Sequence, residues 1–242
     1  MRMRRGVRGW QVGIGLVLVS LIVCVVGAVI FVNGDSSGGY SESGGAAAQG
    51  DDPVALSGGG AVFVGDSYIK GDGAPGKQGL AILAASKLGL TPTLSADAQS
   101  GYTRAGRRGY TTRQLVDEAP DRLGAQIVVL ASGFCDVLGS PPDSTRLRAE
   151  ARSAVSAAAD KWPRARIIVL GPWTPSGDAT VNQRAVNDAL RDVAVEEDVA
   201  FIDTVSTPIV RSEMIGTDRV NPTPAGHRAI ASELVRRIKA VV

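Results

Sequence analysis

The segment Gly65-Asp66-Ser67-Tyr68 contains the first side chain that could act as a nucleophile, the hydroxyl of Ser67. It follows residues 61–64, a short apolar run with β-branched and aromatic side chains that is typical of a buried strand. Gly65 permits a sharp turn at the end of this strand. Because ligands bind at the carboxyl edge of open α/β sheets, Ser67 is a candidate nucleophile. Gly-Asp-Ser is also ordinary turn sequence, so the motif alone does not establish catalysis.

The other candidate residues lie in loops beside predicted strands or just before and at the start of the last predicted helix. They are Gly101, Cys135, Asp218, Asn221 and His227. In a parallel sheet the loops at the carboxyl ends of the strands lie at one edge. We therefore expect a composite site around Ser67.

The elements that must position these residues follow an alternating pattern. Apolar runs that predict strands lie at 61–64, 127–131, 167–170 and 199–202, with a weaker one near 91–98. Stretches with helical period lie at 78–88, 112–123, 144–160, 180–196 and 225–241. Buried strands separated by helices indicate a parallel sheet covered on both faces. The sequence predicts one three-layer α/β/α domain of about five strands over residues 61–242.

The N-terminal region has a different composition. Residues 1–11 are rich in arginine, and residues 12–32 contain no charged side chain, which is long enough for a transmembrane helix. The positive-inside rule places the N-terminus in the cytoplasm and the domain outside. A cleaved signal peptide, which would give a secreted form, is the alternative to this single-pass anchor. Residues 33–60 are rich in Gly, Ser and Ala and predict a flexible linker.

Composition and charge exclude some functions. The 242 residues carry a net charge of +2 and are 44% hydrophobic, as in an ordinary globular chain. Basic and acidic side chains nearly balance in residues 61–242, so we expect no nucleic-acid partner. Cys135 is the only cysteine of the domain, since Cys24 lies in the predicted anchor. The domain therefore needs a stable core rather than a disulfide.

Two cofactor signals are unconvincing. Residues 71–77 have the glycine spacing of nucleotide-binding loops, but they do not directly follow the strand, and Gln78 stands where a P-loop has Ser or Thr. His227 is the only histidine of the chain, so clustered zinc ligands are absent from the sequence. We expect neither a cofactor nor a metal.

The candidate blocks together resemble the SGNH, or GDSL-type, hydrolases over residues 61–240. Ser67 matches the family's nucleophile, Gly101 or Gly109 its glycine, and Gly133-Phe134-Cys135-Asp136 its Gly-x-Asn-Asp block. Asp218-Arg219-Val220-Asn221-Pro222 matches its Asp-x-x-His-Pro block. The resemblance implies a flavodoxin-like fold and serine ester hydrolysis. It also implies an oxyanion hole formed by Ser67, Gly101 and Cys135, with Asp218 orienting the base.

Two departures from the family pattern weaken the predicted chemistry. Asn221 stands where the family has its histidine, and an amide cannot accept a proton near neutral pH. Cys135 stands at the asparagine position, and a thiol is a weak hydrogen-bond donor. Loss of a triad member commonly lowers turnover by about 10⁴ to 10⁶. The residues therefore predict little ordinary esterase activity.

Some of the remaining side chains have two interpretations. His227 is either a packing or capping residue near the start of the last helix, which we favour, or a substitute base. Cys135 is more simply a buried packing residue than a nucleophile. Asp66 and Asp136 are interpreted as turn residues that bind local N–H groups. The cluster Arg104, Arg107 and Arg108 is a solvated surface or, less simply, a contact for an anionic envelope glycan or lipid.

Two functional hypotheses follow. The first is a membrane-anchored, extracytoplasmic serine esterase or deacylase that acts on acyl esters of cell-envelope glycans or lipids, with activity that is weak or lost. The second is a catalytically inactive domain of the same fold that binds an acylated glycan or a protein partner. The sequence does not identify such a partner or an oligomeric state.

Overall fold

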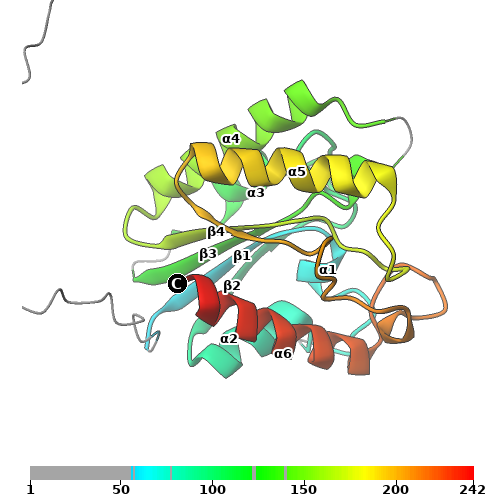
Figure 1. The fold of residues 1–242 in the computed structure, drawn as a ribbon. Coiled ribbons are helices and arrows are strands. Elements are labelled where there is room, and N and C mark those ends of the chain that lie inside the picture. Colours follow the sequence, from blue (N-terminus) through cyan, green and yellow to red (C-terminus); the bar gives the residue numbers. More distant parts are fainter. Residues whose placement is uncertain (1–55, 57, 77, 122–123, 139–140) are drawn as a thin grey trace, which may run out of the picture. The chain divides into compact units, whose positions relative to one another are not determined.

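The computed structural model describes residues 56, 58–76, 78–121, 124–138 and 141–242 (Figure 1). The predicted anchor at 12–32 and most of the predicted linker lie outside these residues. Within the part that the structure describes, no helix is long and apolar enough to span a bilayer.

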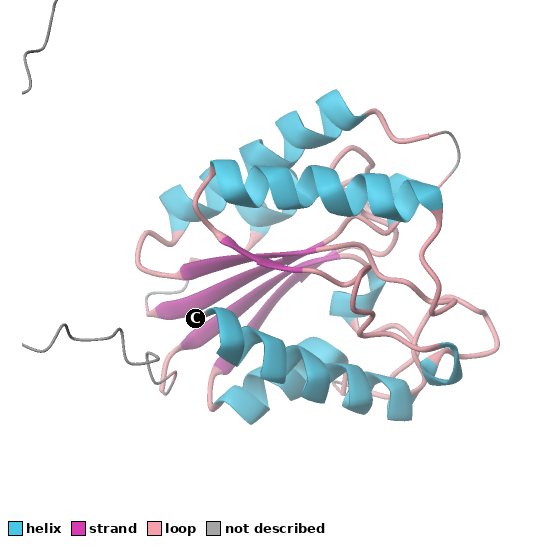
Figure 2. Cartoon of the chain, in the orientation of Figure 1, coloured by secondary structure: helices cyan, strands magenta, loops and turns pink. Residues whose placement is uncertain are grey.

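The centre of the domain is a five-stranded parallel sheet (Figure 2). Its strands are β1 (Gly60–Gly65), β2 (Thr91–Ala96), β3 (Ala125–Ala131), β4 (Arg166–Leu170) and β5 (Ala200–Ile202). All neighbouring pairs are parallel, in the order β2-β1-β3-β4-β5. This is the flavodoxin-like order. The predicted sheet is confirmed, including the weakly signalled strand near 91–98.

Helices cover both faces of this sheet (Figure 1). Helices α3 (Thr112–Glu118), α4 (Ser144–Lys161) and α5 (Val181–Glu196) lie on one face, and α2 (Leu80–Leu88) and α6 (Pro224–Val241) lie on the other. Two 3₁₀ turns, η1 (Cys135–Val137) and η2 (Ser212–Met214), lie in the connecting loops. The predicted three-layer architecture is confirmed.

Two local features differ from the predicted elements. A four-residue helix, α1 (Ser67–Lys70), begins at the candidate nucleophile itself. Helix α3 ends at Glu118, before the predicted end at 123, because Pro120 excludes helical backbone at Ala119, whose ψ is 135°.

Alternating side chains of the strands form the core. On β1, Ala61 and Phe63 face the layer of α2 and α6, while Val62 and Val64 face the layer of α3, α4 and α5. All four side chains are fully buried. Burial on both faces agrees with the place of β1 between β2 and β3, and the carboxyl end of β1 presents Ser67 at the sheet edge.

Candidate functional site

Ser67 is the first residue of α1 and lies directly beyond the end of β1. Its neighbour Asp66 caps this helix, with Oδ1 accepting a hydrogen bond from the Tyr68 N–H at 3.0 Å. Ser67 is largely buried, with 8% of its surface exposed, whereas its neighbours Asp66 and Tyr68 are fully buried. The Ser67 N–H belongs to the first helical turn and has no intrahelical acceptor, so it is suited to bind a ligand oxygen.

Two side-chain hydrogen bonds bring neighbouring loops to this turn. Ser100 Oγ donates to the Gly65 carbonyl oxygen at 3.2 Å, which holds the loop after β2. Tyr68 Oη donates to the Val220 carbonyl oxygen at 2.7 Å, which holds the loop before α6. The structure thus gathers the segments around residues 101 and 218–221 beside Ser67.

Asp136 joins the loop after β3 to the loop after β2. Its Oδ2 accepts from the Tyr102 N–H at 2.8 Å, and its Oδ1 accepts from the Thr103 N–H at 2.8 Å and the Thr103 hydroxyl at 2.6 Å. The interpretation of Asp136 as a residue that binds local N–H groups is wrong, because these donors lie 33 and 34 positions away. No sequence signal announced this long-range contact.

Gly101 lies against Asp136, whereas its rival Gly109 does not. A Cβ at Gly101 would lie 2.5 Å from Asp136 Oδ2, so only glycine fits there. Gly109 is exposed in the turn at 106–110, with nothing within 4 Å of such a Cβ. The Gly101 N–H, however, donates to the Arg104 carbonyl oxygen at 2.9 Å. In this arrangement it is not free to stabilise an oxyanion.

Cys135 is a buried thiol at the start of η1. It is 3% exposed, and burial, together with the nearby Asp66 and Asp136 carboxyl groups, raises the pKa of Cys135 to about 12. The side chain therefore stays protonated at neutral pH, where a thiol is neither a nucleophile nor more than a weak donor.

Asp218 and Asn221 form a compact pair in the loop before α6. Asp218 Oδ1 accepts from the N–H groups of Val220 and Asn221, both at 2.9 Å, and Oδ2 accepts from Asn221 Nδ2 at 2.9 Å. These bonds lower the pKa of Asp218. Asn221 Oδ1 is buried and has no hydrogen-bond partner among the described residues. Asp218 thus orients a side chain that can accept a hydrogen bond but not a proton.

His227 is fully buried within α6, with both ring nitrogens engaged. Nδ1 accepts from the Leu80 N–H at 3.1 Å, and Nε2 lies 3.0 Å from the Asp72 carbonyl oxygen, which assigns the proton to Nε2. Gly79 offers α2 no side-chain cap, so His227 supplies the missing acceptor. Burial lowers the pKa of His227. This environment favours a structural role over that of a substitute base.

A buried carboxyl and two stacked rings support the Ser67 turn from inside. Burial raises the pKa of Asp66 to about 7. Trp173 lies beside this carboxyl and partly offsets the effect, although its Nε1 makes no well-formed hydrogen bond to Oδ2. The Trp173 and Tyr68 rings are stacked, with centroids 4.9 Å apart. Sequence reasoning missed Trp173, although it follows the strand at 167–170 and so lies at the same sheet edge.

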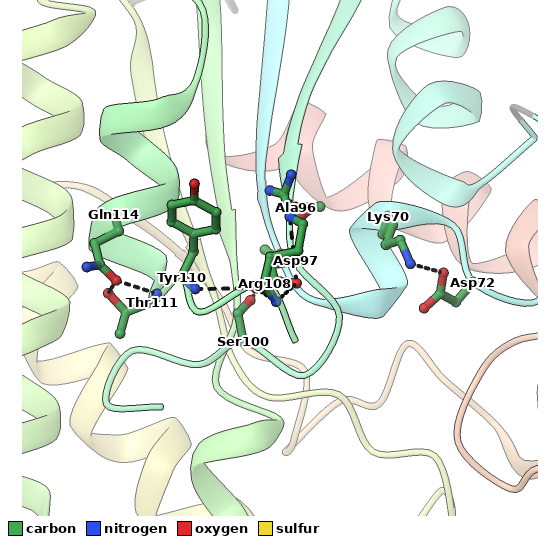
Figure 3. A network of polar contacts seen from close by, with 10 residues as sticks. Lys70, Asp72, Ala96, Asp97, Ser100, Arg108, Tyr110, Thr111 and Gln114 are labelled. Atoms are coloured by element: carbon green, nitrogen blue, oxygen red, sulfur yellow. Dashed lines mark hydrogen bonds and ion pairs between the residues drawn. The ribbon is translucent and has the colours of Figure 1, made fainter. Parts of the chain in front are cut away.

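One arginine of the cluster after Gly101, Arg108, is engaged within the domain and lies beside Asp97 (Figure 3). The Arg108 N–H donates to Asp97 Oδ2 at 2.8 Å, and its guanidinium lies 5.1 Å from the Tyr110 ring centroid. Arg104 and Arg107 are exposed and make no ion pair with a described residue. These two remain candidates for contact with an anionic ligand.

The glycine-rich loop at 71–76 supports the site rather than forming the strand-to-helix turn of a nucleotide site. Gly73 has a φ of 93°, and a Cβ there would lie 2.2 Å from the Pro222 carbonyl oxygen. The loop thus packs against the segment that carries Asn221. In the described part of the chain, no three His, Cys, Asp or Glu side chains gather in a group that could hold a metal ion.

Comparison with solved structures identifies esterases of the same fold. A carbohydrate esterase family 2 enzyme of Corynascus thermopiles has a TM-score of 0.61 and 19% identity, covering 78% of this chain and 68% of that one. The psychrotrophic esterase EstA of a Pseudoalteromonas species has a TM-score of 0.60 and 13% identity, covering 76% of this chain and 98% of that one. At these identities the likeness shows the fold.

Sequence comparison is more specific. A GDSL lipase of Mycobacterium tuberculosis is 27% identical over 182 residues, which cover 72% of this chain and 78% of the relative. The model of the GDSL-like lipase/acylhydrolase family matches residues 63–229, from β1 into α6. The matched residues include the Ser67 turn, Asp136 with its hydrogen bonds to Tyr102 and Thr103, and the Asp218–Asn221 pair. The chain belongs to the GDSL-like lipase/acylhydrolase family.

Proposed function

We propose that the domain binds acyl esters over Ser67 and hydrolyses them slowly or not at all. The observation that carries this proposal is the hydrogen bond from Asn221 Nδ2 to Asp218 Oδ2. The carboxylate that would orient a catalytic base is bound to an amide instead. The Ser67 hydroxyl then keeps its proton at neutral pH and is a poor nucleophile.

The oxyanion donors support the same conclusion. The Gly101 N–H is bound to the Arg104 carbonyl, and the N–H groups of Tyr102 and Thr103 are bound to Asp136. Of the oxyanion donors that the family resemblance implies, the Ser67 N–H and the weakly donating Cys135 thiol remain. Loss of one oxyanion donor typically costs about 3–4 kcal/mol of transition-state stabilisation.

A second candidate is an active esterase or deacylase, which family membership favours. It requires a base that reaches Ser67 after rearrangement. His227 would have to release Leu80 and Asp72 for this role.

We further propose that the ligand is an acylated glycan or lipid of the cell envelope and that residues 12–32 anchor the chain in the membrane. Structural neighbours named as carbohydrate esterases make an acylated glycan a reasonable first ligand to test. N-terminal sequencing of the mature protein checks the anchor. A start beyond Gly34 would indicate cleavage instead.

Two measurements on the full-length protein separate the candidates. Acetylated xylo-oligosaccharides are titrated by NMR, with the chemically deacetylated oligosaccharides as the matched control. A fluorophosphonate probe then tests the reactivity of Ser67, with Ser67→Ala as the blank. Selective binding of the acetylated ligand with little labelling supports the proposal. Rapid labelling at Ser67 would instead support the active esterase.

A further inference from the structure

A pocket of about 350 Å³ lies between the loop after β4 and the segment from η2 to the Asp218–Asn221 pair. Its lining is mainly apolar, and three of its residues, one arginine and two serines, have polar side chains. The lining residues are Pro175, Ser176, Ser212, Ile215, Gly216 and Arg219. Such a lining suits a short, partly apolar group that ends in a polar or charged function.

Contacts of Tyr68 place this pocket next to the serine turn. The Tyr68 ring stacks on Trp173, two residues before Pro175, and its hydroxyl binds the carbonyl of Val220, which follows Arg219. On each side of the pocket, a residue close in sequence to the lining is thus in direct contact with Tyr68, the residue after Ser67. Tyr68 therefore links both walls of the pocket to the turn that carries Ser67.

Arg219 is the charged residue of the pocket, and its backbone is held in an uncommon conformation. Its φ is 58°, in the left-handed region that non-glycine residues rarely adopt. The Arg219 N–H donates to the Gly216 carbonyl oxygen at 3.0 Å, and Asp218 Oδ1 accepts from the next two N–H groups. These hydrogen bonds hold the backbone of Arg219 in its left-handed conformation. Uncommon backbone conformations of this kind often occur at functional sites.

The charge of Arg219 is uncompensated by a direct partner. Within the described residues it makes no ion pair, whereas neighbouring Arg211 pairs with Glu213 at 2.7 Å. The adjacent Asp218 is negative, but both its oxygens already accept hydrogen bonds. A guanidinium in a partly apolar pocket binds a carboxylate well, because its donors match the two oxygens.

We propose that this pocket binds a carboxylate carried by the acyl ester whose ester group lies over Ser67. The inference rests on the proposed function, because it assigns the charge of that same ligand. It predicts that anionic esters bind better than neutral esters of the same shape.

The test uses 4-acetoxybenzoate and its neutral methyl ester, titrated by NMR into full-length protein carrying Ser67→Ala to prevent turnover. We expect about tenfold tighter binding of the anionic ester, the size of one charge-assisted contact. Added salt should reduce the preference. Arg219→Gln should abolish it, Arg219→Lys should keep part of it, and Arg184→Gln, at an exposed arginine of α5, should leave it unchanged.

Each other outcome overturns the inference. Equal binding of the two esters would refute the carboxylate subsite while leaving ester binding at Ser67 intact. A preference that survives Arg219→Gln, or falls equally with Arg184→Gln, would assign it to general surface charge. Failure of both esters to bind would refute the subsite and the proposed function together.

Discussion

The Asn221 side-chain amide donates a 2.9 Å hydrogen bond to Asp218 Oδ2, so the aspartate positions a group that cannot take up a proton. This relationship keeps the geometry of an orienting carboxylate without the chemistry of a base. It makes the site a defined starting point for restoring catalysis.

The first prediction is that Asn221→His combined with Cys135→Asn restores esterase activity. The imidazole would bind Asp218 through one nitrogen and present the other to Ser67, and the new amide would add an oxyanion donor. Hydrolysis of p-nitrophenyl acetate should rise by about 10²-fold or more, below the full contribution of a triad. The same double variant with Ser67→Ala is the control. A folded but inert double variant would show that the pocket itself has diverged.

The second prediction concerns His227, which should act on stability. His227→Ala leaves the Leu80 N–H and the Asp72 carbonyl unpaired, and each lost partner costs about 1–3 kcal/mol. Chemical denaturation should show this loss, and His227→Asn should recover part of it by retaining an acceptor. In the restored Asn221→His enzyme, His227→Asn should leave kcat nearly unchanged. A selective loss of kcat with normal stability would identify His227 as a base.

The third prediction is a pH dependence due to Asp66. Because burial raises its pKa in the folded protein from 3.8 to about 7, the folded state holds a proton that the unfolded chain has released. The stability from this group is fully present below pH 3.8 and is lost as pH rises towards about 7. Over this range the free energy of unfolding should fall by about 1.4 kcal/mol per pH unit, the value for one proton. Asp66→Asn keeps a capping oxygen and should remove this slope. An unchanged slope in urea denaturation would contradict the assignment.

The fourth prediction is that Asp136 orders the loop at 101–104. Asp136→Ala removes the acceptor for two amides and one hydroxyl. Hydrogen exchange at Tyr102 and Thr103 should accelerate, and stability should fall by about 2–3 kcal/mol. Asp160→Ala, at an exposed aspartate of α4, is the matched control. Unchanged protection of the Tyr102 and Thr103 amides from exchange would show that Asp136 does not order this loop.

The fifth prediction compares two glycines of one loop. Gly73 and Gly76 both have positive φ angles, but only at Gly73 would a Cβ collide with the chain, at the Pro222 carbonyl. Gly73→Ala should therefore lower stability by about 1–3 kcal/mol more than Gly76→Ala. Amide chemical shifts around Asn221 should move in Gly73→Ala alone. Equal effects would mean that the loop does not support the site.

The sequence determined the fold and the place of the serine. Alternating apolar strands and helical stretches are local patterns, so they predicted all five strands and the three layers. A strand ending in Gly65-Asp66-Ser67 also predicts a serine at the sheet edge, because chain direction in a parallel sheet fixes where each strand ends. The family resemblance further predicted that Asn221 stands at the position of the family's histidine base.

Only the tertiary structure decided which groups pair within the site. Asp136 reaches two N–H groups more than 30 residues away, and His227 caps a helix 147 positions earlier. Trp173 stacks on Tyr68 from another strand end. Such partners depend on how the crossovers place loops beside one another, which no local pattern encodes. The physical reason is that burial obliges each polar group to find a partner wherever the fold supplies one.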